Sequence, residues 1–168
     1  MNDEGVVVGE KRTMKNWKVL CFWIGLSEAV GVVAGLLTRK DVQIYSSEIV
    51  KPLLSPPPVL FPVVWTVLYV LMGYGAARIF MTSAPKGRTR ALWFFGVQLF
   101  LNFGWCFIFF SSQSFGAAFL WLLALIVAVV GMFLTFHKID KVAAYTQTAY
   151  LLWLLFAAYL NFSVWLLN

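Results

Sequence analysis

The chain alternates between long apolar runs and short polar segments. Each apolar run is close to the length of about 20 residues that a helix needs to cross the hydrocarbon core of a bilayer. The five runs cover residues 19–37, 59–81, 91–110, 115–136 and 143–167. This pattern predicts an all-α integral membrane protein, a bundle of five transmembrane helices that forms a single domain over residues 19–168.

Composition agrees with a membrane protein and argues against other classes. Hydrophobic residues make up 61% of the 168 residues and charged residues only 12%, whereas soluble domains carry about 25% charged residues. The net charge of +6 comes from short basic clusters between the apolar runs, so it favours the lipid bilayer and not nucleic acid as partner. Cys21 and Cys106 both lie in apolar runs, and we expect neither a disulfide nor a metal site.

Charge placement predicts the orientation in the membrane. Residues 1–18 form a polar N-terminal tail of mixed charge, which is not typical of a transit peptide. If successive polar segments alternate between the two sides, one side holds Lys11, Arg12, Lys15, Lys18, Arg78, Lys86, Arg88, Arg90, Lys138 and Lys141. The other side holds Arg39, Lys40 and Lys51. The positive-inside rule then predicts a cytoplasmic N-terminus and an external C-terminus.

The connection over residues 38–58 is the longest between two apolar runs, and it is external on this topology. One interpretation is a structured lid, in which residues 46–50 open a short helix before Lys51 and Pro52. The prolines at 56–58 favour an extended path into the second span. The other interpretation is a plain connector, and the pattern does not decide between the two.

Polar and aromatic residues share helix faces inside three of the runs. Two faces have i, i+4 and i+7 spacing: Trp65 with Tyr69 and Met72, and Gln98 with Asn102 and Trp105. Tyr150, Trp153, Ala157 and Asn161 form a similar stripe in the last run. The predicted topology places most of these side chains in the outer half of the bilayer. A cavity there would suit a planar, mostly apolar ligand. The alternative is that the amides only join helices while the indoles fill space.

Other intramembrane residues allow several hypotheses. Glu28 is the single acid inside a predicted span, and it is a proton or cation site, an internally bonded structural residue, or an acid protonated in lipid. Arg78 near the inner end of the second span fits a snorkelling anchor. Gly31 and Gly35 form a GxxxG pattern that permits close helix packing. The single histidine, His137, lies at the predicted boundary, and no known catalytic motif is present.

Three segments resemble the translocator protein family, also described as tryptophan-rich sensory protein (TspO) or peripheral benzodiazepine receptor. Residues 56–74, PPPVLFPVVWTVLYVLMGY, are similar to its PP...F...W..LY..MGY signature. Residues 98–105, QLFLNFGW, resemble the QL.LN..W of its third helix. Residues 150–165 resemble the Y..W..FA..LN...W of its fifth helix. The likeness extends from the first span to the C-terminus.

This resemblance implies a homodimeric five-helix bundle that binds porphyrins, haem-like tetrapyrroles and benzodiazepine or isoquinoline ligands beneath the first loop, with no required cofactor. The resemblance suggests most of the ligand-binding residues, and Asn161 is added because it lies on the same helix face as Trp153 and Ala157. The full set is Tyr45, Trp65, Asn102, Trp105, Trp153, Ala157 and Asn161. Trp65 and Asn102 match polar ligand contacts of the family. Trp153 matches a tryptophan implicated in porphyrin chemistry.

Three functions stay open. The first is a receptor or transporter-like protein for tetrapyrroles, with a role in stress signalling. The second is light- and oxygen-dependent degradation of protoporphyrin through Trp153, and the third is proton-coupled export through Glu28. Leu54 and Val59 replace loop tryptophans of many members, and no basic residue follows Tyr159, which weakens the sterol-binding pattern. The resemblance and the charge bias favour a bacterial plasma membrane.

Overall fold

The computed structural model describes the backbone of residues 3–82 and 85–168, and the side chains of residues 16–82 and 87–168. Within these residues the protein is a bundle of helices. The elements are α1 (Asp3–Leu37), α2 (Arg39–Glu48), α3 (Leu60–Met81), α4 (Pro85–Cys106), the π-helix η1 (Phe107–Ser111), α5 (Phe115–His137), α6 (Lys141–Tyr145) and α7 (Thr148–Leu167). Four residues of the charge count, Lys11, Arg12, Lys15 and Lys86, lie outside the described side chains.

Five segments are long and apolar enough to cross a membrane, which confirms the predicted class. They are Asn16–Leu37, Leu60–Met81, Gly87–Ser111, Phe115–His137 and Lys141–Leu167. Their bounds differ from the predicted ones by at most a few residues. The last segment is interrupted between α6 and α7, so it is not one continuous helix. The chain is an integral membrane protein.

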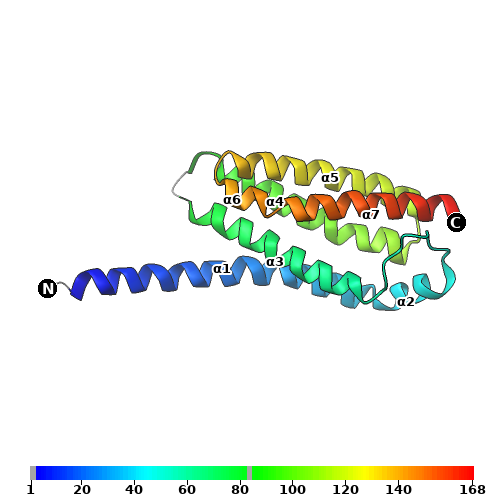
Figure 1. Cartoon of the computed structure of the whole chain (residues 1–168), viewed down its shortest axis with the longest axis horizontal. Helices are drawn as coiled ribbons and strands as arrows, with labels where there is room; N and C mark the ends of the chain where they lie inside the picture. Colours follow the sequence, from blue (N-terminus) through cyan, green and yellow to red (C-terminus); the bar gives the residue numbers. More distant parts are fainter. Residues whose placement is uncertain (1–2, 83–84) are drawn as a thin grey trace.

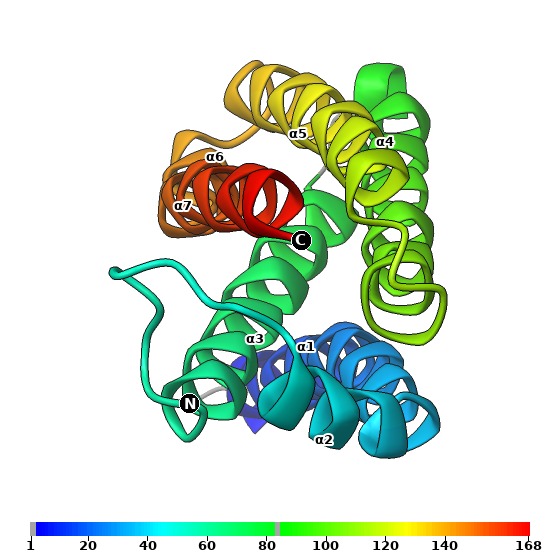
Figure 2. The same cartoon turned by 90° about the vertical axis from the view of Figure 1, so that its right-hand side faces the viewer.

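The helices form two groups when the bundle is viewed along its length (Figure 2). Helix α1 packs mainly along α3, while α4 packs on α5 and α5 packs on α7. Figure 1 shows α2 and the C-terminus at one end of the bundle, which we call the α2 end, and α6 at the other, which we call the α6 end. Large apolar side chains such as Phe22 and Leu120 are exposed on the outside, as expected for surfaces in contact with lipid.

Small residues set the close contact between α1 and α3. A Cβ at Gly73 would overlap the backbone of Ile24, and a Cβ at Gly31 would overlap the ring of Tyr69. A Cβ at Gly35 would meet nothing within 4 Å. Only Gly31 of the GxxxG pattern therefore lies at a close helix contact. We call this α1–α3 contact the glycine seam.

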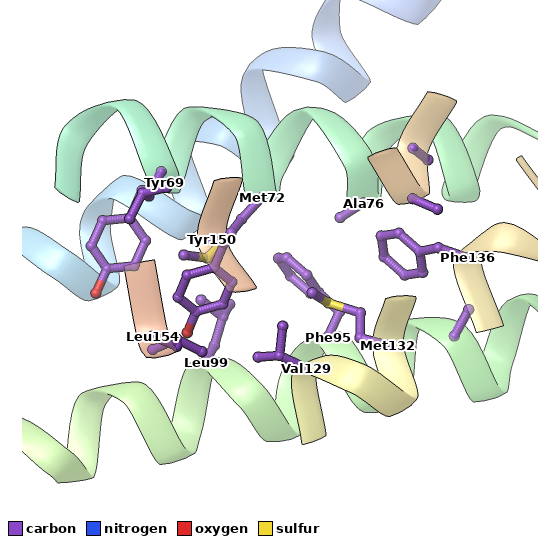
Figure 3. Close-up of a cluster of buried hydrophobic side chains, with 14 of the residues drawn as sticks. Tyr69, Met72, Ala76, Phe95, Leu99, Val129, Met132, Phe136, Tyr150 and Leu154 are labelled. Carbon is purple, nitrogen blue, oxygen red and sulfur yellow. The ribbon is translucent and has the colours of Figure 1, made fainter. Parts of the chain in front are cut away.

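The core lies where α3, α4, α5 and α7 meet (Figure 3). Met72, Met132 and Phe136 are fully buried there, and Tyr69 and Tyr150 lie together toward one end of the cluster. Lipid tails are as apolar as these side chains, so their packing acts mainly through van der Waals contact. The hydroxyl groups of Tyr69 and Tyr150 form hydrogen bonds in this otherwise apolar cluster.

An ion pair closes the α6 end. Arg78 Nη2 lies 2.8 Å from Asp140 Oδ2, and Arg78 Nε donates to the same oxygen at 2.9 Å. The other oxygen of Asp140 accepts from the backbone N–H of Ala143 at 3.0 Å and so caps α6. Burial raises the pKa of Asp140, but these hydrogen bonds outweigh it and lower the pKa overall. Arg78, which was expected to be a snorkelling anchor, is therefore paired with Asp140, the residue directly before α6.

The first connection contains a helix, but not at the predicted place. The lid interpretation expected a helix to open at residues 46–50, whereas α2 begins at Arg39 and has already ended at Glu48. Asp41 lies in its first turn, where a negative charge stabilises the helix dipole. Ile49, which follows the helix, is extended. Residues 46–48 are thus its last turn.

Candidate functional site

Asn102 of α4 lies at the centre of a hydrogen-bond network that we call the amide hub. Its Oδ1 accepts from the hydroxyl of Tyr69 on α3 at 2.7 Å, and its Nδ2 donates to the hydroxyl of Tyr150 on α7 at 2.9 Å. Asn102 is only 3% exposed. The ring of Trp65 lies 5.5 Å from that of Tyr69 and 6.2 Å from that of Tyr150. The hub thus joins three membrane-spanning helices.

A second pair of predicted residues is joined closer to the α2 end. Trp105 Nε1 donates to Oδ1 of Asn161 at 3.2 Å. Asn161 Nδ2 in turn donates to the carbonyl of Phe115 at 2.8 Å, and Asn161 is 1% exposed. The bond from the indole is longer than the others, which makes it the weakest of the set.

Tyr45 reaches this pair through a stack of aromatic rings. The Trp105 ring stacks on that of Phe109 with centroids 4.7 Å apart. The Tyr45 ring lies 5.2 Å from Phe109 and 5.4 Å from Phe110. Both phenylalanines belong to η1, whose wider turn changes the direction of the side chains at the end of α4. Burial raises the pKa of Tyr45, which favours its neutral phenol in this stack.

Hydrogen bonds hold the connection over the α2 end, and we call residues 39–51 the cover. Ser111 Oγ donates to Asp41 Oδ2, which joins α2 to η1. Val50 N donates to Asn168 Oδ1 at 3.0 Å, and Asn168 Nδ2 donates to the carbonyl of Val50 at 3.1 Å. The cover is therefore attached both to η1 and to the end of α7.

The structure does not bring Trp153 into the amide hub. Trp153 lies on a groove between α3 and α7 with a volume of about 430 Å³. The groove is lined by apolar side chains and this indole: Val63, Val64, Val67, Leu68, Ala149, Leu152, Trp153 and Phe156. The Trp153 ring lies 6.0 Å from that of Phe61. Ala157 is half-buried against the core.

Sequence reasoning missed the tyrosines that complete the hub. Tyr69 and Tyr150 lie on the predicted faces of Trp65 and Trp153, but they were not assigned to the site. The signal that could have identified them was the presence of two phenols and an amide on neighbouring membrane helices, where they can form hydrogen bonds with one another. No pattern in the sequence pointed to Phe109, because the π-helix that orients it has no recognised sequence signature.

The chemistry of this region is hydrogen bonding and stacking. Among the described residues, no group of three or more His, Cys, Asp or Glu side chains could hold a metal ion. Cys106 is a free cysteine whose thiol donates to the carbonyl of Asn102 at 3.8 Å. The ring of His137 lies near those of Phe133 and Tyr145 and far along α5 from Phe115. The hub and its neighbours offer indoles, phenols and amides to a ligand.

Comparison with known proteins gives concordant matches. A family model described as TspO/MBR family matches residues 23–166. The tryptophan-rich protein TspO of Chlorobaculum tepidum is 37% identical over 150 residues, which cover 89% of this chain and 95% of the relative. The protein of the same name from Archaeoglobus fulgidus is 34% identical, over 83% of this chain and 90% of its own. The human translocator protein is 32% identical, over 68% of this chain and 69% of its own.

Proposed function

This chain belongs to the TspO/MBR family, and we propose that it is a membrane receptor or transporter-like protein that binds a porphyrin or related tetrapyrrole. Synthetic ligands of the benzodiazepine or isoquinoline type would share the site. The ligand lies beneath the cover, between Trp65, Asn102 and Trp105, with Tyr45 above it.

One observation carries this proposal: neutral polar groups converge between aromatic rings inside a membrane-spanning bundle. Asn102 has Tyr69 and Tyr150 as partners, and Trp65 lies against both rings. A flat apolar ligand gains stacking energy from the indoles and a few directional hydrogen bonds from amides and phenols. Polar groups are costly in lipid unless they serve packing or function.

Binding would exchange one hydrogen bond for another. The indole N–H of Trp105, bound to Asn161 at 3.2 Å, is the donor most easily transferred to a carbonyl or carboxylate of the ligand. The ring of Phe109 occupies the stacking position beside Trp105 while the cover is attached. A ligand that stacks on Trp105 would therefore displace Phe109 and, with it, Tyr45.

The decisive experiment measures protoporphyrin binding by quenching of tryptophan fluorescence in detergent micelles. We expect Trp65→Ala combined with Asn102→Ala to weaken binding by at least about tenfold, or 1.4 kcal/mol. Gln147→Leu is the matched control, because it also removes a fully buried amide, but one bonded to Leu71 and Ala143. Unchanged affinity in a folded double variant would contradict the site.

A second candidate function is the light- and oxygen-dependent degradation of protoporphyrin. Its support is the position of Trp153, whose indole is half-buried on the wall of the apolar groove and so accessible to a ligand dissolved in the bilayer. Illumination with oxygen should then convert bound protoporphyrin into a new product, and Trp153→Phe should abolish that product. Bleaching at the rate of free porphyrin would remove this candidate.

We propose a bacterial plasma membrane with the α6 end in the cytoplasm. Charge supports the orientation: Arg88, Arg90, Lys138 and Lys141 lie at or next to the span ends on that side. Labelling with a membrane-impermeant maleimide, in a background without Cys21 and Cys106, should modify Ser47→Cys from outside intact cells. Lys138→Cys should react only after the cells are opened.

A further inference from the structure

Glu28 is a half-buried acid that the proposed ligand site does not use, and one of its carboxyl oxygens, Oε1, is fully buried. Of the seven acidic residues, it alone lies inside a segment able to span the membrane. On α1 it stands between Ile24 and Gly31, one turn from each. These two residues make the closest contacts of the glycine seam, with Gly73 and Tyr69 respectively. Glu28 therefore belongs to the part of α1 that is pressed most closely against α3.

One oxygen of the Glu28 carboxyl group, Oε1, is buried without a hydrogen-bond partner among the residues that the structure describes. Two other acids differ, since Asp140 is paired with Arg78 and Asp41 accepts from Ser111. An ionised carboxylate without a cation is among the most costly groups inside a membrane, whereas the protonated acid avoids that cost.

Among the residues that the structure describes, the groups facing this stretch of α1 supply no positive charge. On α3 the titratable neighbour is the phenol of Tyr69, which donates its proton to Asn102. On α4 the polar groups at the corresponding level are the neutral amides of Gln98 and Asn102, followed by the thiol of Cys106. The charged residues of α2 begin only after α1 has ended at Leu37. With only neutral groups beside it among the described residues, the carboxylate can be neutralised by a proton.

We propose that Glu28 is a proton-binding site, neutral at pH 7, and that release of its proton loosens the glycine seam between α1 and α3. One carboxylate oxygen takes the proton from water and holds it as an O–H group. Loss of the proton creates a charge that needs water, and movement of α1 away from α3 would let water reach the buried Oε1. The ring of Tyr69 packs against Gly31, and the hydroxyl of Tyr69 donates a hydrogen bond to Asn102. Movement of α1 would therefore affect the amide hub through Tyr69. The proposal does not rest on any ligand.

Infrared spectroscopy tests the protonation directly. In dodecyl maltoside, a detergent without a carbonyl group, the wild-type protein should show the C=O band of a protonated carboxylic acid at pH 7. Glu28→Gln should remove this band, and Glu48→Gln, on the exposed face of α2, should leave it. Absence of the band in the wild type, or its survival in Glu28→Gln, would overturn the proposal. So would a band that appears only after sodium is replaced by choline, because Glu28 would then bind a metal cation.

Hydrogen exchange tests the link to the seam. As the pH is raised through the loss of the band, amide exchange in α1 and α3, corrected for its intrinsic pH dependence, should speed up at least about tenfold in the wild type. Exchange in Glu28→Gln should stay at the slow rate, because the amide side chain is neutral at every pH. If amide exchange in α1 speeds up equally with pH in both proteins, the proposed coupling between the proton and the glycine seam is wrong, even if the infrared band is observed.

Discussion

The two ends of the bundle are held together by different kinds of bond. At the α6 end a charged pair, Arg78 and Asp140, fixes α3 to the start of α6. Toward the α2 end neutral groups do this work, with Asn102 at their centre. Bonds to charged groups contribute about 1.5–3 kcal/mol, and neutral ones about 0.5–1.5 kcal/mol. The weaker set is the one a ligand can exchange, so the contrast separates a structural end from a binding end.

The largest effect on stability is expected at the charged end. Asp140→Ala removes the partner of Arg78 and the cap of α6, and it should lower the free energy of unfolding by about 2–3 kcal/mol. Arg78 is 34% exposed and can still reach water, which keeps the loss below that of a fully buried pair. Thermal unfolding in detergent measures it, and protoporphyrin affinity should not change. A loss of affinity as large as that in the Asn102 variants would show that the two ends are not separate.

Acid should weaken the contribution of the Arg78–Asp140 pair to the free energy of unfolding. The folded state lowers the pKa of Asp140 below its ordinary value of 3.8, so its contribution to stability is complete above that value. The contribution is lost as the pH falls through the lower, folded-state pKa. The stability difference between the wild type and Asp140→Asn should therefore shrink below about pH 4. A difference that stays constant from about pH 6 to about pH 3 would contradict this account.

At the neutral end stability and binding should separate. Asn102→Leu removes two hydrogen bonds, and bonds between membrane helices average about 0.6 kcal/mol, so stability should fall by only about 1 kcal/mol. Ligand affinity should fall by at least about tenfold, because the side chain that orients the polar edge is lost. Gln147→Leu serves again as the control. Equal changes in stability and affinity for both variants would remove the distinction.

The smallest effect is expected at the cover. Asn168→Ala removes the two hydrogen bonds to Val50, both near the surface, and should cost about 0.5–1 kcal/mol. If the cover closes over the ligand, the dissociation rate should rise several-fold while the association rate changes little. Stopped-flow fluorescence measures both rates. Lys40→Ala, at an exposed position of α2, is the matched control. An unchanged dissociation rate would favour the plain-connector interpretation.

Hydropathy was enough to predict the five spans, because the lipid requires long apolar segments whatever the tertiary contacts. Helix periodicity was enough to place Gln98, Asn102 and Trp105 on one face. It could not predict partners from distant segments, such as Arg78 and Asp140, which are 62 residues apart. Nor could it locate the start of α2 at Arg39. The π-helix, which brings Phe109 between Trp105 and Tyr45, gave no sign in the sequence.

The glycine seam also bears on the order in which the protein is assembled. Gly31 with Tyr69 and Gly73 with Ile24 are contacts between the first two membrane spans of the chain. Because both halves of these contacts precede α4 in the chain, they enter the bilayer before α4 does. The first two spans can thus associate as a helical hairpin during synthesis, and the later helices are added to a surface that already exists.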